Sequence, residues 1–135
     1  MAIPVSKLKG VDSSLVQKLE SKGIVDSDHL LDATKSPAER VRLSEQVGVE
    51  SRAILELANR ADLSRVHGVA GVYSDLLEQA GVDTVKELAT RRPENLHAKI
   101  EEINSAHRLS ARTPTLSMVE DWVTQAKTLP KLLTY

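Results

Sequence analysis

The side chains that could carry out catalysis are few, and they are not spaced for it. The four histidines are His29, His67, His97 and His107, and no two of them have the i, i+4 spacing of a helical zinc site. His97 and Glu101 do have that spacing, but an exposed ion pair explains a single such pair better. The chain has no cysteine and no nucleophile-elbow, Walker or dinucleotide-binding motif. The sequence therefore predicts a protein that is not an enzyme and that binds no metal ion or cofactor.

Two glycine turns are better candidates for binding, because basic residues lie next to each and a helix is expected to start soon after it. Unpaired N–H groups at a helix N-terminus, together with the helix macrodipole, favour an anion such as a backbone phosphate. The candidate nucleic-acid contacts at the two turns are Lys7, Lys9, Gly10, Arg65, His67 and Gly68. The alternative interpretation is that the basic side chains are solvated faces of short helices.

The two turns belong to a longer internal repeat, in which segment 5–30 aligns with segment 63–88 without a gap. The identities fall largely on glycines and apolar anchors, where backbone geometry and packing are most restrictive. The identical pairs are Ser6/Ser64, Gly10/Gly68, Val11/Val69, Leu19/Leu77, Glu20/Glu78, Gly23/Gly81 and Leu30/Leu88. This pattern indicates a duplication.

Each copy resembles the helix-hairpin-helix motif, in which the hairpin amides and the second helix hold one DNA phosphate without reading the base sequence. The matching residues are Gly10, Val11, Val16 and Leu19 in the first copy and Gly68, Val69, Ser74 and Leu77 in the second. Both copies lack the second glycine of the motif, which is replaced by Asp12 and by Ala70. A carboxylate at that position repels a phosphate, and we expect Asp12 to cap the helix that follows it.

A wider resemblance covers nearly the whole chain. The segments 61–69, 73–88, 93–96 and 119–130 are, in this order, similar to the domain-of-unknown-function family 4332. The resemblance implies a tandem helix-hairpin-helix architecture. It implies little about activity, because a fold alone does not determine a function.

Apolar spacing and capping signals predict an all-α protein. Capping boxes are expected at Ser36, Thr84 and Ser117, and left-handed helix ends at Gly23 and Gly81. The expected helices are about 5–9, 13–22, 27–34, 37–47, 51–61, 64–67, 72–80, 84–91, 94–104 and 117–128, with an irregular loop over 105–114. We expect one compact domain over 1–135, a duplicated helix-hairpin-helix fold with approximate internal two-fold symmetry. Its repeats are about 1–62 and 63–135.

Composition and charge narrow the class of protein. The chain has 135 residues, of which 41% are hydrophobic and 27% charged, and it has no phenylalanine, so the core is aliphatic. The net charge of −1 excludes a global positive field that would attract nucleic acid. No cysteine, no signal peptide and no membrane-spanning run are present, which predicts a cytoplasmic protein without disulfides.

Residues 128–135 form a short apolar tail at the C-terminal end of the sequence. Leu129, Leu132, Leu133 and Tyr135 are candidate contacts to another protein. We nevertheless expect the tail to fold back, because the apolar helix face around Trp122 needs cover. Tyr73 and Trp122 are expected to pack in the core rather than to stack on nucleobases.

Two functions remain after these exclusions. The first is a non-catalytic scaffold or adaptor that binds another protein. The alternative is sequence-independent binding of a DNA or other nucleic-acid backbone through the hairpins. Neither a membrane nor a small-molecule substrate is expected as a partner.

Overall fold

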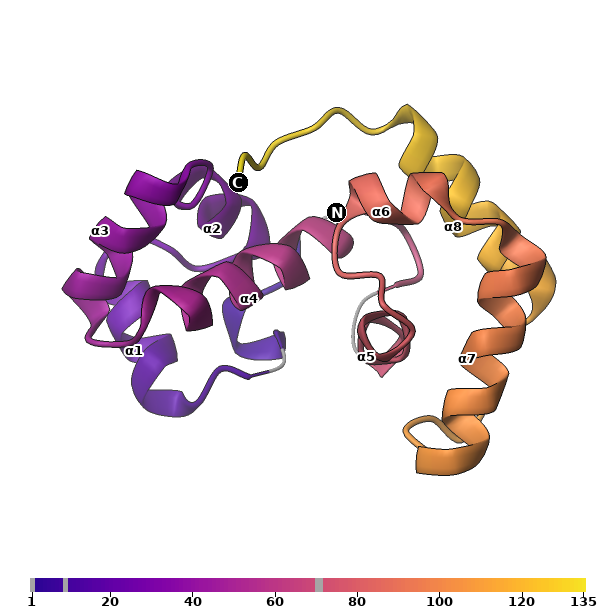
Figure 1. Ribbon diagram of the computed structural model, residues 1–135. Coiled ribbons are helices and arrows are strands. Elements are labelled where there is room, and N and C mark those ends of the chain that lie inside the picture. Colours follow the sequence, from indigo (N-terminus) through magenta and orange to yellow (C-terminus); the bar gives the residue numbers. More distant parts are fainter. Residues whose placement is uncertain (1, 9, 70–71) are drawn as a thin grey trace. The chain divides into compact units, whose positions relative to one another are not determined.

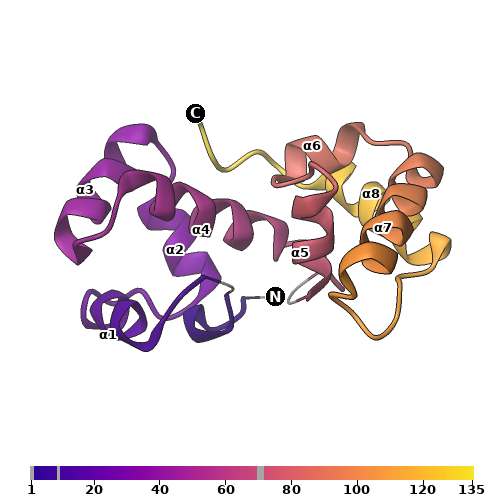
Figure 2. The same ribbon diagram turned by 60° about the horizontal axis from the view of Figure 1, so that its bottom comes forward.

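The computed structural model describes residues 2–8, 10–69 and 72–135, and these residues form short helices joined by turns (Figures 1 and 2). The described residues contain no strand, only an isolated antiparallel bridge between Pro4 and Asp26. The predicted all-α class is confirmed. The elements are a 3-10 turn η1 (Val5–Lys7) and the helices α1 (Ser13–Ser21), α2 (Ser27–Ala33), α3 (Pro37–Val47), α4 (Ser51–Leu63), α5 (Val72–Gln79), α6 (Val85–Thr90), α7 (Pro93–His107) and α8 (Leu116–Thr128).

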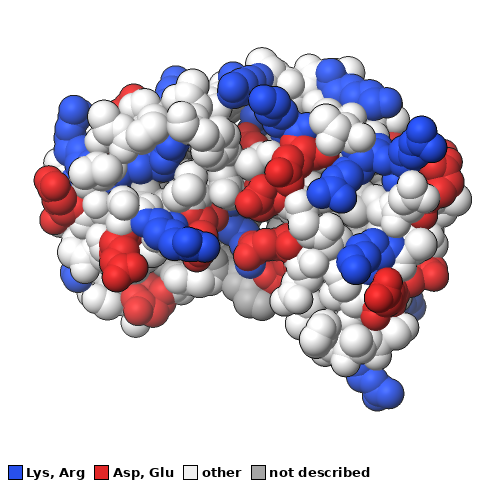
Figure 3. Space-filling model, in the orientation of Figure 1, with Lys and Arg blue, Asp and Glu red and all other residues white. Residues whose placement is uncertain are grey.

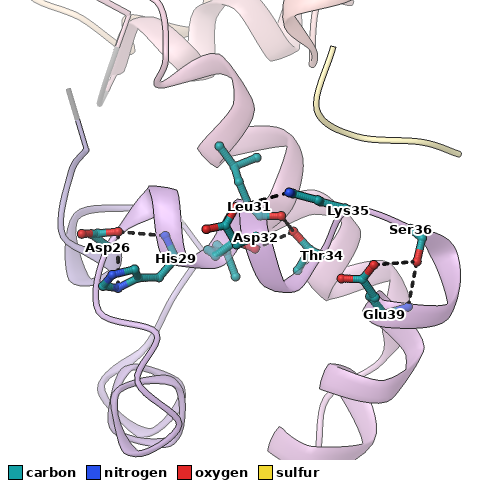
Figure 4. Close-up of polar contacts among 9 residues, drawn as sticks. Asp26, His29, Leu31, Asp32, Thr34, Lys35, Ser36 and Glu39 are labelled. Carbon is teal, nitrogen blue, oxygen red and sulfur yellow. Dashed lines mark hydrogen bonds and ion pairs between the residues drawn. The ribbon is translucent and has the colours of Figure 1, made fainter. Parts of the chain in front are cut away.

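Several helix starts follow capping signals in the sequence. The side chain before the helix accepts a hydrogen bond from a backbone N–H three residues later at Asp12, Asp26, Ser36 and Thr84. Figure 4 shows the Ser36 cap, in which the hydroxyl accepts from the Glu39 N–H at 3.2 Å and donates to the Glu39 carboxylate. The predicted caps at Asp12, Ser36 and Thr84 are confirmed.

The predicted cap at Ser117 is wrong. Helix α8 begins at Leu116, and the Thr115 hydroxyl accepts from the Met118 N–H at 3.1 Å. Thr115 has the extended backbone of a cap (ψ 159°), whereas Ser117 already lies inside the first turn of the helix. Ser117 has a glutamate three residues later and Thr115 has a methionine, so the capping-box pattern favours the hydroxyl that does not cap the helix.

Two other expected boundaries differ from the structure. Residues 64–67, expected as a short helix, form a turn after α4, which itself continues to Leu63. Helix α7 continues to His107, so the irregular loop starts at Arg108 rather than at Ser105. Arg108 ends α7 in the left-handed conformation at φ 49°, a role for which glycine is the usual sequence signal.

Helices α1 and α5 end in the same way, at positions that the alignment of segments 5–30 and 63–88 pairs. Gly23 and Gly81 have φ values of +80° and +90°, so the predicted left-handed ends are confirmed. The residue after each glycine donates its N–H to a carbonyl five residues earlier, Ile24 to Leu19 at 3.0 Å and Val82 to Leu77 at 2.8 Å. This is the Schellman arrangement, and the apolar residues in both pairs are buried.

The chain divides into two compact units. Unit 1 comprises residues 1–64 together with 132–135, and unit 2 comprises residues 65–131. In unit 1, α4 packs against α2 and α3, and α1 packs against η1 and α3. The core of unit 1 is aliphatic, as expected, and its fully buried members are Val5, Leu19, Leu30, Ile54, Ala58 and Ala61.

Unit 2 is built around α8. This helix packs against α6 and α7, and α5 packs against α7. Trp122 of α8 is 2% exposed, and its ring centroid lies 5.5 Å from that of the half-buried Tyr73 on α5. The expected core role of Trp122 is therefore confirmed. No helix in the part of the chain that the structure describes is long and apolar enough to cross a bilayer.

The C-terminal tail packs onto its own chain, but not where we expected it. Leu133 is 2% exposed and belongs to the core of unit 1. The Thr134 N–H donates to the Lys35 carbonyl at 2.8 Å, and an Arg40 guanidinium N–H donates to the Thr134 carbonyl at 2.7 Å. The expectation that the tail covers Trp122 is wrong, because contacts inside unit 2 bury that side chain.

Candidate binding site at the glycine turns

Hairpin 1 is the turn around Gly10, and it is open beside this glycine. Gly10 is exposed with φ +90°, and a methyl group added there would meet no atom within 4 Å. Lys7 is exposed next to the hairpin, whereas Lys9 lies outside the described residues. Leu8 is buried and anchors the turn in unit 1. Hairpin 1 therefore offers a ligand an accessible glycine and one described basic side chain beside it.

The anion-binding position at the start of α1 is occupied by a side chain of the protein. The Asp12 Oδ1 accepts from the Leu15 N–H at 2.8 Å. A phosphate at the N-terminus of α1 would need such a free N–H group and would lie beside the negative charge of Asp12. The carboxylate therefore competes with a phosphate both for the hydrogen bond and through its charge.

Hairpin 2, residues 66–69, is held by α8. The Gln125 Oε1 accepts from the His67 N–H at 2.8 Å, and the Gln125 Nε2 donates to the His67 carbonyl at 3.2 Å. The same Nε2 also donates to the Asp121 carboxylate at 2.8 Å, which orients the amide group. Both backbone groups of His67 are thus bound to a side chain of unit 2, although its own side chain is exposed.

The glycine of hairpin 2 also lies against α8. Gly68 has φ +93°, and a methyl group added there would lie 3.1 Å from the indole Nε1 of Trp122. This distance is tighter than ordinary van der Waals contact, in contrast to the open space at Gly10. Ala70, which replaces the second glycine of the motif, lies outside the described residues.

Arg65, the basic candidate beside hairpin 2, is engaged within unit 2. Its Nη2 donates to the Pro130 carbonyl at 2.6 Å. The guanidinium would have to give up this bond or share it in order to reach a phosphate. The described candidate nucleic-acid contacts Lys7, Gly10, His67 and Gly68 are exposed, and of the two glycines it is Gly10, at hairpin 1, that has free space beside it.

The tail residues named as candidate protein contacts differ in exposure. Leu133 is buried, Leu129 and Leu132 are half-buried, and Tyr135 is 62% exposed. The Tyr135 hydroxyl donates to the Asn59 side chain at 2.9 Å. The Cζ of the Arg40 guanidinium lies over the Tyr135 ring, 5.4 Å from the ring centroid. Tyr135 is therefore the tail residue with the most surface available to another protein.

The remaining titratable candidates serve the fold. The His97 Nε2 lies 3.2 Å from the Glu101 carboxylate and 3.0 Å from the Pro114 carbonyl, so it connects α7 to the loop before α8. The His97 side chain is only 20% exposed, so the pair is less exposed than we expected. Within the described ranges, no group of three or more His, Cys, Asp or Glu side chains is arranged to bind a metal ion.

Charges of both signs are mixed on the face of the molecule that Figure 3 shows. Figure 3 shows Lys and Arg side chains interspersed with Asp and Glu rather than gathered into one basic field. Some of these charges form ion pairs along a helix, such as Arg52 with Glu56 at 3.6 Å. A mixed surface agrees with the net charge of −1 and provides little non-specific attraction for a polyanion.

The contacts that α8 makes with hairpin 2 were not predicted from the sequence. Asp121 and Gln125 lie one helical turn apart, so a pattern could place them on one face of a helix. Nothing in the sequence connects Gln125 with His67, to which it is bound across a long stretch of chain. Such a contact forms only when the helices of unit 2 pack.

Comparisons with known proteins place the chain in a family without an assigned role. The model of a family described as "Domain of unknown function (DUF4332)" matches residues 9–129. No curated protein and no solved structure matches the chain.

Proposed function

This chain belongs to the domain-of-unknown-function family 4332, and we propose that it is a non-catalytic binding module that acts as a scaffold or adaptor for a protein partner. We propose further that it consists of two duplicated helix-hairpin-helix units. A cytoplasmic location is part of the proposal, and the absence of cysteine supports it. The description of the family names no activity, so the proposal rests on the residues of the two hairpins.

The backbone supports the duplication. Gly10 and Gly68 occupy matching positions of the two repeats and have φ values of +90° and +93°. The glycine ends of α1 and α5 share the same two hydrogen bonds. The packing inside the units also corresponds, because α4 contacts α2 and α3 in unit 1, as α8 contacts α6 and α7 in unit 2.

The observation that carries the proposed function is the occupied anion position at α1. The Asp12 carboxylate accepts the N–H of Leu15, which removes a donor and adds a negative charge where the motif holds a phosphate. At hairpin 2, Gln125 binds both backbone groups of His67. These internal contacts favour protein binding over nucleic-acid binding as the role of the helical surface.

A second candidate function rests on the openness of hairpin 1. Gly10 has free space around it and Lys7 beside it is exposed, which is what a contact to a nucleic-acid backbone requires. Sequence-independent binding through Lys7, Lys9 and Arg65 would involve about three phosphates. Such binding weakens about 40-fold between 50 mM and 200 mM salt.

Fluorescence anisotropy with a labelled DNA duplex of about 20 base pairs distinguishes protein binding from nucleic-acid binding as the function. We expect no saturable binding at 50 mM salt, together with specific binding of a protein that co-purifies with the chain and rebinds it after separate purification. The DNA alternative predicts micromolar binding that weakens steeply with salt.

Charge-reversal variants make this test specific. The variant with Lys7→Glu, Lys9→Glu and Arg65→Glu removes the proposed phosphate contacts. The matched control with Lys86→Glu, Lys99→Glu and Lys127→Glu makes the same change in net charge away from the hairpins. Binding of DNA that is lost in the first variant and kept in the control would overturn the protein-partner proposal in favour of the alternative.

A further inference from the structure

Unit 1 has a shallow groove that the functions considered above do not use. It lies where the end of α1, the end of α2 and one face of α3 meet, and its volume is about 270 Å³. We call it the α1–α3 groove. Its lining includes Lys22, Ile24, Ala33, Glu39, Arg42 and Leu43.

The corresponding place in unit 2 is filled by an arginine. The alignment of segments 5–30 and 63–88 pairs Gly23 with Gly81, and its 58-residue offset continued three residues further pairs Ala33 with Arg91. The Arg91 Nη2 donates to the Gly81 carbonyl at 3.0 Å and would lie 3.4 Å from a methyl group on that glycine. At Gly23, a methyl group would meet no atom within 4 Å. Unit 1 therefore leaves open a space that unit 2 closes with its own side chain.

The groove has an apolar floor and a cationic rim. Ile24 and Leu43, at 7% and 4% exposed, form the floor together with Ala33. Lys22 and Arg42 are exposed at the rim, and neither has an ion-pair partner among the described residues. Glu39, the acidic residue of the groove, accepts a hydrogen bond from the Ser36 hydroxyl at 3.2 Å. The groove thus combines a small hydrophobic surface with two free positive charges.

We propose that the α1–α3 groove binds a short acidic segment of a protein partner. An apolar side chain of that segment lies on the floor, and carboxylates beside it pair with Lys22 and Arg42. The proposal rests on the proposed function, in which the partner is a protein, and it adds the chemistry that the partner presents. The volume lies just under the roughly 300–1,000 Å³ of small-molecule pockets, which suits about one or two side chains.

The charge and polarity of the groove distinguish a peptide from a nucleic acid. A nucleic-acid backbone offers only sugar carbons between charged phosphates, which match Ile24 and Leu43 less well than a branched aliphatic side chain does. An acidic peptide with an apolar residue satisfies both the floor and the rim, because electrostatic complementarity selects the partner while apolar burial supplies affinity.

Panning a phage-displayed library of random heptapeptides on the full chain at about 50 mM salt tests the proposal. We expect enrichment of peptides in which Asp or Glu flank a Leu, Ile, Val or Met. The most enriched peptide is then synthesised with a fluorescent label, and its affinity is measured by anisotropy.

The variants are designed from the two units themselves. Ala33→Arg copies the residue that closes the place in unit 2, and we expect it to weaken peptide binding at least tenfold, about 1.4 kcal/mol. The double variant Lys22→Glu with Arg42→Glu should abolish binding. Lys86→Glu, a charge reversal in unit 2, is the control and should leave the affinity unchanged. Circular dichroism checks that each variant remains folded.

Three results would overturn the proposal: no enrichment of acidic peptides, peptide binding that Ala33→Arg does not weaken, or DNA binding that depends on Lys22 and Arg42. Failure of the proposed function has a different signature, because it is DNA binding that depends on Lys7, Lys9 and Arg65. The test variants of the two proposals share no residue, so each failure is recognised separately.

Discussion

At the scale of single residues, Asp12 sets the charge and the hydrogen bonding at the start of α1, beside hairpin 1. It stands where the helix-hairpin-helix pattern has its second glycine, and its carboxylate accepts the N–H of Leu15. The side chain therefore caps α1 and repels an anion at the same position. The cap is intramolecular, so a phosphate that binds at this position would have to displace it.

Asp12→Gly is expected to convert hairpin 1 into a phosphate-binding hairpin. Glycine is nearly as good a helix cap as aspartate, so the free energy of unfolding should fall by only a few tenths of a kcal/mol. Removing the carboxylate frees the Leu15 N–H, and we expect salt-sensitive DNA binding to appear in the anisotropy assay at 50 mM salt. Asp12→Asn, which keeps a capping oxygen without the charge, should bind less well than Asp12→Gly. Equal absence of binding in both variants would show that Asp12 does not control the site.

The two hairpin glycines make a matched pair for substitution. Both have φ near +90°, where an alanine is strained, so Gly10→Ala should lower the free energy of unfolding by about 1 kcal/mol. At Gly68 the added methyl group also lies 3.1 Å from the Trp122 ring, so Gly68→Ala should lower the free energy of unfolding by about a further 1–2 kcal/mol. Urea denaturation followed by circular dichroism measures both losses. A larger loss at Gly10 than at Gly68 would contradict the packing of Trp122 on hairpin 2.

At the scale of the helical elements, the start of α8 and its contacts decide how hairpin 2 is held. Because Thr115 rather than Ser117 caps the helix, α8 begins at Leu116. Trp122 and Gln125 both face hairpin 2, one against Gly68 and the other on the backbone of His67. The three-residue spacing places these two side chains on one face of the helix.

Gln125→Ala is expected to release the backbone of His67. The loss of two partly exposed hydrogen bonds should cost about 1 kcal/mol. A more specific readout is hydrogen exchange, because the His67 amide should lose its protection while amides inside α5 keep theirs. Thr124→Ala on the same helix removes only a hydroxyl that bonds within α8, so it serves as the control. Unchanged exchange at His67 would show that the Gln125 contact does not persist in solution.

At the scale of the whole molecule, the chain forms one unit from segments at both ends. Residues 132–135 return to the unit formed by residues 1–64. The Arg40 guanidinium, 5% exposed, donates to the carbonyls of Thr34 and Thr134 at 2.9 and 2.7 Å, so it connects the tail with the turn after α2. Figure 1 shows the yellow end of the chain next to α2, within unit 1.

Deleting residues 132–135 is expected to destabilise unit 1. Burial of the Leu133 side chain contributes about 2 kcal/mol, and the deletion also removes a hydrogen-bond partner of the buried Arg40. The thermal transition should move to lower temperature, and hydrogen exchange should increase over residues 34–40. Deletion of Tyr135 alone, which is 62% exposed, is the control and should have a much smaller effect. Equal stability of the full chain and the chain lacking 132–135 would contradict this role of the tail.

Local interactions explain how much of the fold could be predicted. The helix starts at Asp12, Ser36 and Thr84 and the glycine ends at Gly23 and Gly81 depend on bonds between residues close together in the chain. Such bonds follow from the local sequence, so most helix limits agree closely with the expected ones. The predicted start of α8 was wrong because the capping-box pattern at Ser117 and Glu120 is not used and Thr115 caps the helix. The predicted end of α7 was wrong because Arg108 takes a conformation typical of glycine.

The candidate site was predicted only in part, for the same reason. Gly10, Gly68 and the cap at Asp12 could be recognised because their roles follow from the local backbone. The bond between Gln125 and His67 joins residues far apart in the chain, and the open α1–α3 groove depends on three helices meeting. By itself the sequence determined most of the helices and many of their ends, through short-range hydrogen bonds and apolar spacing. Only the tertiary structure decided that α8 covers hairpin 2, that the tail enters unit 1 and that the groove stays open, because packing between distant segments sets these contacts.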